Sequence, residues 1–356
     1  MQTRNLVLFM TVLVTLGLAV PGSVALGDEV TVPPLASENS TYIVGFYELP
    51  EDRETYQGEP VTKVNEVLKF FVVESENPVT FQVEAKLDDR VRYLEEESRD
   101  WQLHLVPNDE FYNHAAHWGS KRIGGEAAWD TTLGSTSIKV AHLDSGLNKG
   151  HEEFANSGRV LQGYDFYNGD NDPDDTSGCN YHGTHTTGTA GASIDNVHGI
   201  AGMSQHTILP VKIFQYVNPL YGCSTTTSAI TDGLMYAADQ GAHLSSNSWG
   251  GGGSSTAIND AIAYAHNAGT IHVASAGNSG PCTNCVGQPW TDNPDKSIVV
   301  SSLTDGDTFS DFSSQGPEVD IIAPGDYIAG PESGTDSYVA MSGTSMAAPH
   351  VTGSLA

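Results

Sequence analysis

After about residue 130, short apolar runs alternate with segments in which apolar residues recur every three or four positions. The runs predict buried strands, and the periodic segments predict amphipathic helices. The predicted strands are 137–143, 208–213, 243–248, 270–274 and 298–301, and the predicted helices are 229–240 and 257–268. This alternation favours an α/β fold, with a doubly wound, mainly parallel sheet covered by helices on both faces. In such a fold, ligands bind at the carboxyl ends of the strands.

The pattern changes before about residue 105. Strand-like runs at 42–47, 67–73 and 80–85, with a charged, helix-like stretch that ends at 91–96, predict a small, separate α+β domain. Ahead of it, Arg4, an apolar run over 6–20 and small residues up to Ala25 form the pattern of a signal peptide over residues 1–25. The apolar run is shorter than the roughly 20 residues of a membrane span, and an uncleaved anchor is the alternative. We therefore expect a secreted protein with no stable membrane insertion after signal cleavage.

Acidic residues outnumber basic ones by 44 to 15, which gives a formal net charge of −29. Such a surface repels nucleic acid and anionic membranes, so neither is an expected partner. Five aspartates crowd one Gly-, Asn- and Pro-rich loop: Asp165, Asp170, Asp172, Asp174 and Asp175. Like charges this close repel one another unless a hard cation lies between them, and carboxylate oxygens are typical ligands of Ca²⁺. The loop predicts a calcium site, with a solvated acidic loop as the alternative.

Four motifs bring polar side chains to predicted strand ends or helix starts. Ser345 lies in G-T-S-M-A-A-P, where a helix N-terminus offers free N–H groups to developing negative charge. Alone, this serine could be an ordinary N-cap, which is the commoner role of a serine at a helix start. Asp144 follows the strand 137–143, His182 begins H-G-T-H, and Asn278 ends A-S-A-G-N after the strand 270–274.

Asp144, His182 and Ser345 together meet the needs of nucleophilic catalysis. A serine nucleophile needs a base to take its proton, and the base needs a carboxylate that holds it in one tautomer. The chain order Asp–His–Ser is that of subtilisin and differs from those of chymotrypsin and the α/β-hydrolases. With the Asn278 motif, these segments resemble the subtilases, the subtilisin-type serine proteases, from about Trp101 to the end of the chain. The resemblance implies that Ser345 is the nucleophile, His182 the general base and Asp144 its partner, with the Asn278 amide and the Ser345 N–H as an oxyanion hole.

The same resemblance implies a substrate pocket between two segments. One wall is Ser248, Trp249 and Gly250, and the other is Ser275, Ala276 and Gly277. An extended peptide would add as a strand to the edges of this cleft. Trp249 stands where many subtilases have a leucine, and it either narrows the pocket or packs beneath it. These segments contain no acidic residue, so a strict preference for basic side chains is not expected.

Domain boundaries also follow from the resemblance. Residues 26–104 would be a propeptide that assists folding and inhibits the enzyme, with V-R-Y-L-E-E at 91–96 as its last strand and self-cleavage near His104. A generic linker domain is the alternative. Residues 105–356 would be the catalytic domain, which we expect to be incomplete at its C-terminus because subtilases normally continue well beyond the serine motif.

Alignment with thermitase-like subtilases implies a second calcium site. Its side-chain ligands would be Asp109, Glu153 and Asn196, with backbone carbonyls from Ser193, His198 and Ile200. Glu153 departs from the aspartate usual at its position. Calcium here would tie the mature N-terminus to the domain and stabilise the fold by mass action.

Four cysteines in an exported chain predict two disulfides, with three possible connectivities. Resemblance to aqualysin-like subtilases implies the pair Cys179–Cys223, which leaves Cys282–Cys285. The C-x-x-C spacing of the latter pair also occurs in zinc and redox sites, although no second ligand pair is near in sequence.

The sequence as a whole predicts a secreted, calcium-stabilised serine endopeptidase, made as an autoprocessed zymogen and monomeric. Its partners would be peptide substrates and its own propeptide as an intramolecular inhibitor. Two other classes compete with this interpretation: a catalytically silent subtilase fold used for binding, and a calcium-dependent surface protein. A sedolisin-type acid protease is disfavoured, because its serine motif comes without H-G-T-H.

Overall fold

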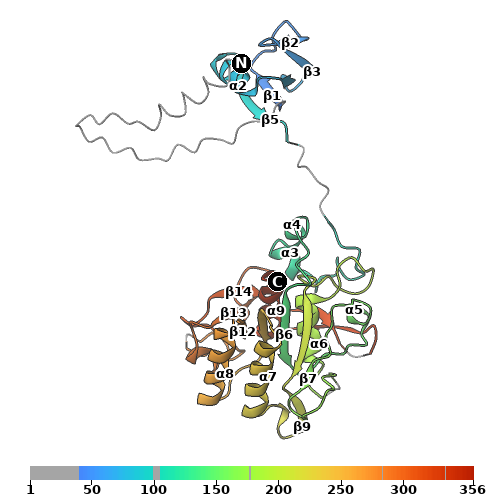
Figure 1. The fold of residues 1–356 in the computed structure, drawn as a ribbon, viewed down its shortest axis with the longest axis vertical. Coiled ribbons are helices and arrows are strands. Elements are labelled where there is room, and N and C mark those ends of the chain that lie inside the picture. Colours follow the sequence, from blue (N-terminus) through green and yellow to red (C-terminus); the bar gives the residue numbers. More distant parts are fainter. Residues whose placement is uncertain (1–39, 99–104, 176–177, 283, 333) are drawn as a thin grey trace, which may run out of the picture. The chain divides into compact units, whose positions relative to one another are not determined.

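The computed structural model describes residues 40–98, 105–175, 178–282, 284–332 and 334–356. The chain divides into two compact units, Met1–Trp101 and Gln102–Ala356 (Figure 1). The predicted signal peptide and the predicted cleavage point near His104 lie outside the described residues.

The first unit is a five-stranded antiparallel sheet with one described helix. The strand order is β2-β3-β4-β1-β5. The elements are β1 (Ser40–Phe46), β2 (Thr55–Tyr56), β3 (Glu59–Asn65), β4 (Phe70–Ser75), α2 (Pro78–Leu87) and β5 (Val91–Glu96). Aromatic side chains of β1, β2 and β4 pack against Phe81 and Ala85 of α2 to form its core. The unit therefore has the predicted α+β composition, and V-R-Y-L-E-E is a strand.

Three local predictions in this unit are wrong. The charged stretch that ends at 91–96 was predicted to be helix-like, but its last six residues form β5 and pair with β1. The run 80–85, predicted as a strand, lies in α2, where Pro78 occupies the first turn. Its apolar residues alternate along the sequence, but the helix buries only Phe81 and Ala85 among them and leaves Val79, Val83 and Leu87 more than half exposed. Pro is well suited to a first helical turn, and this local preference overrides the period-two pattern.

The predicted strand 67–73 begins only at Phe70. The Asn65 side chain accepts hydrogen bonds from the backbone N–H groups of Val67 and Leu68, which holds these residues in a turn. Such side-chain-to-backbone bonds compete with strand pairing.

The second unit contains a seven-stranded parallel sheet in the order β14-β13-β12-β11-β6-β8-β7. Its strands are β6 (Lys139–Asp144), β7 (Tyr164–Asp165), β8 (Thr207–Lys212), β11 (Leu244–Asn247), β12 (Ile271–Ser275), β13 (Ser297–Leu303) and β14 (Ile321–Pro324). The five predicted strands of this region are all present, with ends shifted by at most two residues. The chain passes from β6 to one side for β8 and to the other for β11, as in doubly wound folds.

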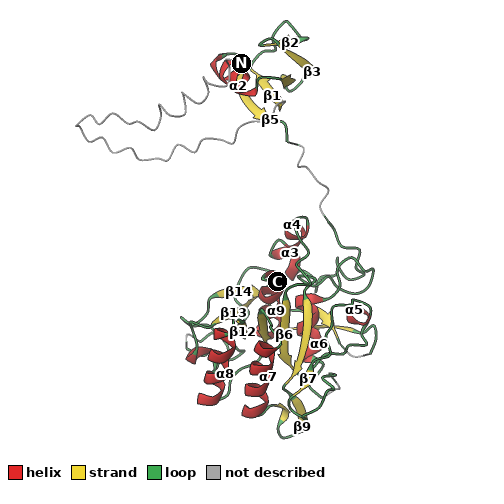
Figure 2. Cartoon of the chain, viewed as in Figure 1, coloured by secondary structure: helices red, strands yellow, loops and turns green. Residues whose placement is uncertain are grey.

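Helices cover both faces of this sheet (Figure 2). The two predicted helices, α7 (Thr227–Asp239) and α8 (Thr256–Asn267), pack beside each other against Ala141, Leu143 and the apolar residues of β8. On the opposite face, α9 (Thr344–Ser354) packs against Val140, Val273 and Val300. Burial on both faces explains why the strands are continuously apolar rather than alternating.

The remaining elements are short. The helices are α3 (Gly119–Arg122), α4 (Gly125–Trp129), α5 (Glu152–Ala155) and α6 (His182–Gly191), and a 3₁₀ turn covers Trp290–Asp292. Two antiparallel hairpins complete the unit: β9 (Gln215–Asn218) pairs with β10 (Gly222–Ser224), and β15 (Ile328–Pro331) pairs with β16 (Tyr338–Met341). No helix in the described part of the chain has the length and apolar character that crossing a bilayer requires.

Candidate active site

Three adjacent strands deliver the predicted site residues to one edge of the sheet. Asp144 ends β6, Ser248 directly follows β11, and Asn278 lies just beyond β12. Two helices begin at this edge, α6 with His182 and α9 with Ser345 as its second residue. Parallel strands end on the same side, so residues far apart in sequence come together here.

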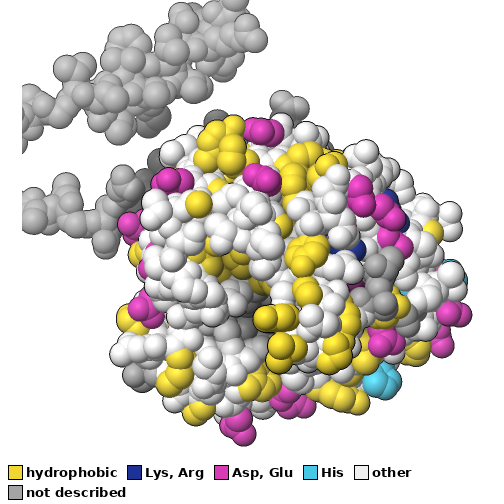
Figure 3. Space-filling view, turned by 90° about the horizontal axis from the view of Figure 1, so that it is seen from below, with side chains coloured by type: hydrophobic (Ala, Val, Ile, Leu, Met, Phe, Trp, Pro, Cys, Tyr) yellow, Lys and Arg dark blue, Asp and Glu magenta, His cyan; other side chains and the backbone are white. Residues whose placement is uncertain are grey.

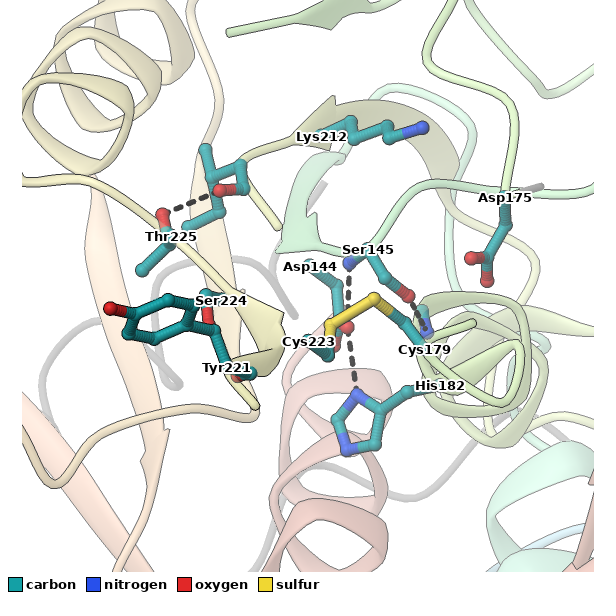
Figure 4. The surroundings of a disulfide bond; sticks show 12 residues. Asp144, Ser145, Asp175, Cys179, His182, Lys212, Tyr221, Cys223, Ser224 and Thr225 are labelled. Atoms are coloured by element: carbon teal, nitrogen blue, oxygen red, sulfur yellow. Dashed lines mark hydrogen bonds and ion pairs between the residues drawn. A yellow bond between two sulfur atoms is a disulfide. The ribbon is translucent and has the colours of Figure 1, made fainter. Parts of the chain in front are cut away.

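His182 and Asp144 form a direct pair. The imidazole Nδ1 lies 2.7 Å from Asp144 Oδ1, and the other ring nitrogen points away from the carboxylate (Figure 4). The Asp144 carboxylate also accepts hydrogen bonds from the Ser145 N–H and the Thr186 hydroxyl. These bonds hold the buried carboxylate in place, so it can fix the orientation and tautomer of the imidazole.

The environment favours the protonated form of His182. Burial lowers the pKa of the imidazole, but the charge of Asp144, its hydrogen bond to the ring and the charge of Asp175 outweigh burial. The net effect raises the pKa of His182 above 6.5. The side chain remains 30% exposed, so the ring is accessible from the solvent side.

Ser345 and Ser248 exchange hydrogen bonds. Ser345 Oγ donates to the Ser248 carbonyl at 3.1 Å, and Ser248 Oγ donates to the Ser345 carbonyl at 2.8 Å. The second bond is possible because Pro349, four residues further along α9, has no N–H to bond this carbonyl. Among the described residues, Ser345 Oγ makes no hydrogen bond to His182; catalytic hydrogen bonds often form only when substrate is bound.

The Asn278 side chain is anchored through its oxygen. Asn278 Oδ1 accepts hydrogen bonds from the Thr344 N–H at 2.9 Å and the Thr344 hydroxyl at 3.0 Å, and that hydroxyl accepts the Gly277 N–H. Because the oxygen is held this way, the amide nitrogen remains available as a donor. A Cβ placed on Gly343 would lie 3.4 Å from Asn278 Nδ2 and 3.6 Å from the Ser345 nitrogen, so both donors border the same space.

Two neighbouring cavities open at this edge. One, of about 320 Å³, is lined by all six predicted pocket residues together with Asn278, Thr344 and Ser345. The other, of about 260 Å³, is lined by Asp144, His182, Phe214 and both cysteines of the Cys179–Cys223 pair. Ser248, Trp249 and Gly250 border both cavities. The structure thus gathers the predicted catalytic and substrate-binding residues around one continuous region.

Trp249 was predicted either to narrow the substrate pocket or to pack beneath it, and its environment has features of both. Its side chain is 8% exposed, and its ring packs 4.9 Å from that of Trp290, whose indole N–H donates to the Trp249 carbonyl. The residue nevertheless lines both cavities. Trp249 therefore packs into the core beside Trp290 and also forms part of the wall of both cavities.

Both cysteine pairs lie at bonding distance. The sulfurs of Cys179 and Cys223 are 2.03 Å apart, which joins the loop before His182 to the hairpin β9–β10 (Figure 4). Cys282 and Cys285 form a second, local bridge, and Cys285 lines the larger cavity. The described residues include no free cysteine.

The five aspartates of the acidic loop do not converge. Asp165 is buried against the Lys212 ammonium, 3.4 Å away, and Asp175 accepts two hydrogen bonds from Thr184. Asp170 and Asp172 are exposed to solvent, and Asp174 uses its carbonyl to bind Lys212. Nowhere in the described ranges do three His, Cys, Asp or Glu side chains gather as a metal site would require. The prediction of calcium in this loop finds no support in the geometry, because a lysine and backbone donors already neutralise its buried carboxylates.

The second predicted calcium site includes two buried carboxylates among its side-chain ligands. Asp109 and Glu153 are both buried, and Asn196 Nδ2 lies 3.3 Å from Glu153 Oε2. Asp109 Oδ1 is buried with no hydrogen-bond partner. Burial raises the pKa of Asp109, and burial together with the charge of Asp109 raises the pKa of Glu153 to about 8. Two buried carboxylates whose ionised forms are disfavoured by burial, one of them with an oxygen that lacks a hydrogen-bond partner, fit a hard cation with oxygen ligands.

Sequence reasoning missed two residues of this site. Thr344 holds the Asn278 oxygen, and Phe214 lines the smaller cavity. Thr344 stands next to Ser345 in the same motif, so its position in the sequence could have identified it as a site residue. Phe214 follows β8 in a run that reads only as apolar strand, and no local pattern marks it.

The topology of the sheet and the chain order of the side chains at its edge define a fold of the subtilisin type. The family model described as "Subtilase family" matches residues 135–356, and the chain belongs to this family.

Individual comparisons agree with this assignment. The thermophilic serine proteinase of Bacillus sp. (strain AK1) is 38% identical over 249 residues, which cover 70% of this chain and 58% of that protein. Thermitase of Thermoactinomyces vulgaris is 37% identical over 249 residues, covering 70% of this chain and 83% of thermitase. Among solved structures, a protease of Pseudoalteromonas arctica PAMC 21717 superposes with a TM-score of 0.60 at 28% identity, covering 70% of this chain and 85% of that one. The chain thus spans less than two thirds of the Bacillus protein.

Proposed function

We propose that this protein is a secreted serine endopeptidase, synthesised as a zymogen and stabilised by calcium. The observation that carries the proposal is the convergence of the His182–Asp144 pair, Ser345 and the free amide of Asn278 on adjoining cavities. A fold used only for binding would have no need of a carboxylate-oriented imidazole beside an anchored amide donor.

The reaction would proceed through an acyl-enzyme. Ser345 Oγ attacks the peptide carbonyl carbon while His182 takes the hydroxyl proton, and Asp144 stabilises the imidazolium. The carbonyl oxygen becomes an oxyanion that accepts hydrogen bonds from Asn278 Nδ2 and the Ser345 N–H. His182 then gives its proton to the leaving amine, and the C–N bond breaks. Water, deprotonated by His182, hydrolyses the ester and restores Ser345.

Substrates would be extended peptides. The segment that follows β11 and the edge strand β10 offer backbone groups on two sides of the cleft, which suits strand addition. The larger cavity has no acidic or basic side chain in its lining. We therefore infer a preference for a neutral side chain at the residue whose carbonyl is attacked.

Residues 26–104 would serve as the propeptide. The first unit has its own apolar core, consistent with a domain that can fold and inhibit the enzyme before it is removed. The apolar run after Arg4 and the paired cysteines support export to an oxidising compartment.

Calcium would bind at Asp109, Glu153 and Asn196, with backbone carbonyls from Ser193, His198 and Ile200 completing the ligand set. The ion would supply positive charge to two buried carboxylates and link the segment around Asp109 to the loop 193–200. The hydrogen bonds of Asp109 and Glu153 to the backbone N–H groups of Asp195 and Ile200 already join these parts of the chain.

The test compares the wild-type full chain with Ser345→Ala by peptide p-nitroanilide hydrolysis, fluorophosphonate labelling and intact mass. Ser354→Ala is the matched control, because Ser354 lies on the same helix and is exposed. We expect hydrolysis, labelling and loss of the propeptide mass in the wild type and in Ser354→Ala, with none in Ser345→Ala. A folded wild type that neither labels nor hydrolyses would instead support a catalytically silent binding protein.

A further inference from the structure

The backbone around Asn278 lies outside regular secondary structure. It follows the end of β12 at Ser275, and Gly277 has a φ of 103°, in the left-handed region that favours glycine. Asn278 is itself exposed to solvent. The direction of its amide therefore depends on contacts from other segments, because neither a strand nor a helix holds this stretch.

Thr344 provides one such contact, and it acts on the side chain. Its N–H and hydroxyl bind Asn278 Oδ1, which sets the rotation of the amide group. This contact alone does not determine where the Asn278 Cα lies.

Ser314 provides a second contact, and it acts on the main chain. The Ser314 N–H donates to the Gly277 carbonyl at 2.9 Å, and Ser314 Oγ accepts the Ser279 N–H at 3.2 Å. These two bonds bracket Asn278 from the residues on either side of it. Just beyond, the Gly280 N–H donates to the Phe312 carbonyl at 2.8 Å, which continues the same contact.

Ser314 is itself rigidly placed. It is fully buried, and its carbonyl accepts a hydrogen bond of 2.7 Å from Ser301 Oγ on β13. Its hydroxyl oxygen lies 3.2 Å from the point where a Cβ on Gly277 would stand, so the two segments are in close contact. Ser314 thus connects the segment around Asn278 to β13, the strand next to β12 in the sheet.

We propose that Ser314 is a positioning residue for the oxyanion hole, which it serves by fixing the backbone on both sides of Asn278 without touching substrate. The inference rests on the proposed function, since it assigns a purpose to the geometry of the Asn278 amide. A donor must lie within about half an ångström of its productive position, and a displacement of 1 Å can cost about a hundredfold in rate.

The first measurement is the kcat and KM of Ser314→Ala with a peptide p-nitroanilide, using the full chain. The oxyanion exists only in the transition state and the intermediate, so we expect kcat to fall about tenfold while KM stays within about twofold. Ser310→Ala is the matched control: Ser310 is equally buried on the same segment, but its hydroxyl binds Ser302 rather than the backbone near Asn278. It should leave kcat unchanged.

A double-mutant cycle distinguishes a role of Ser314 in positioning Asn278 from a general role in stabilising the fold. Asn278→Ala alone should lower kcat by about 10²–10³, the loss measured for an oxyanion-hole asparagine in a member of this family. If Ser314 acts through Asn278, adding Ser314→Ala to this variant should cause no further loss. A full tenfold loss in the Asn278→Ala background, or an unchanged kcat in Ser314→Ala alone, would overturn the proposal.

Two further comparisons cover a Ser314→Ala variant that does not fold and an Asn278→Ala variant that stays active. If Ser314→Ala does not fold, Ser314→Cys retains a small side chain with only a weak acceptor, and the same cycle applies. If Asn278→Ala leaves kcat intact, the assigned oxyanion hole is wrong and the proposed function must be revised. A large effect of Asn278→Ala without coupling to Ser314 contradicts only the role of Ser314.

Discussion

At the scale of single residues, the charge of Asp144 determines how His182 titrates. In the proposed mechanism, His182 acts as a base only when its imidazole is neutral, so kcat/KM should rise with pH through the pKa of His182. Burial opposes the charged imidazole, whereas Asp144 and, to a smaller extent, Asp175 favour it and raise the pKa. The acid limb of the pH profile should therefore lie above 6.5, the ordinary value for histidine.

The influence of Asp144 and Asp175 on the pKa of His182 predicts the effect of two isosteric substitutions. Asp144→Asn should move the acid limb of kcat/KM to lower pH, because the carboxylate charge is lost, and should lower kcat by about 10⁴ through the wrong tautomer. Asp175→Asn should move the limb less and in the same direction, with a nearly unchanged plateau. The measurement is kcat/KM from pH 5 to 10. An acid limb at the same pH in all three proteins would mean that another group controls it.

At the scale of elements, the sequence was most informative where local pattern and burial agree. The strands β6, β8, β11, β12 and β13 were predictable because burial on both faces leaves a short, unbroken apolar run. The helices α7 and α8 were predictable because a single buried face leaves a helical period. The helix α2 was not, because its alternating apolar residues are mostly exposed rather than paired in a sheet.

The hairpin β9–β10 leads to a prediction about the two disulfides. Cys179–Cys223 closes 44 residues and joins this hairpin to the loop before His182, whereas Cys282–Cys285 closes only three. Chain entropy then gives the longer bridge a contribution of about 4 kcal/mol and the shorter one less than about 2 kcal/mol. Replacing both Cys179 and Cys223 by alanine should lower the free energy of unfolding more than replacing the other pair, and should raise KM because an edge of the cleft is released.

Urea unfolding of both double variants in the Ser345→Ala background, which prevents autolysis, measures the stability difference. KM is compared in the active background. Equal losses of stability for the two pairs would contradict the entropic argument. An unchanged KM in the Cys179/Cys223 variant would show that the hairpin does not need the bridge to bind substrate.

At the scale of the whole molecule, acidity distinguishes the surface. Figure 3 shows carboxylates scattered around one face, with few lysine or arginine side chains among them. This agrees with the formal net charge of −29. Exposed carboxylates need no counter-ion, so the proposed calcium site rests on the buried pair Asp109 and Glu153.

Calcium removal should therefore lower the melting temperature of the Ser345→Ala protein. A ligand present at 100 times its Kd stabilises the native state by about 2.7 kcal/mol, and this contribution is lost when the ion is chelated. Asp109→Asn and Glu153→Gln should reduce the difference between calcium and EDTA. Asp195→Asn, an exposed carboxylate on the same loop, should retain it. A calcium-dependent shift that survives both ligand substitutions would place the ion elsewhere, including the acidic loop.

The sequence by itself determined the class of fold, the family resemblance and the candidate catalytic residues, because each depends on local patterns: strand and helix periods, and short motifs whose residue types carry the chemistry. Only the tertiary structure decided which polar groups share a space. It separated the aspartates of the acidic loop, left Asp109 Oδ1 without a hydrogen-bond partner, and brought Thr344 and Ser314 into contact with Asn278 and its neighbours. These outcomes depend on contacts between residues distant in the chain, and hydrogen bonds of that kind leave no period in the sequence.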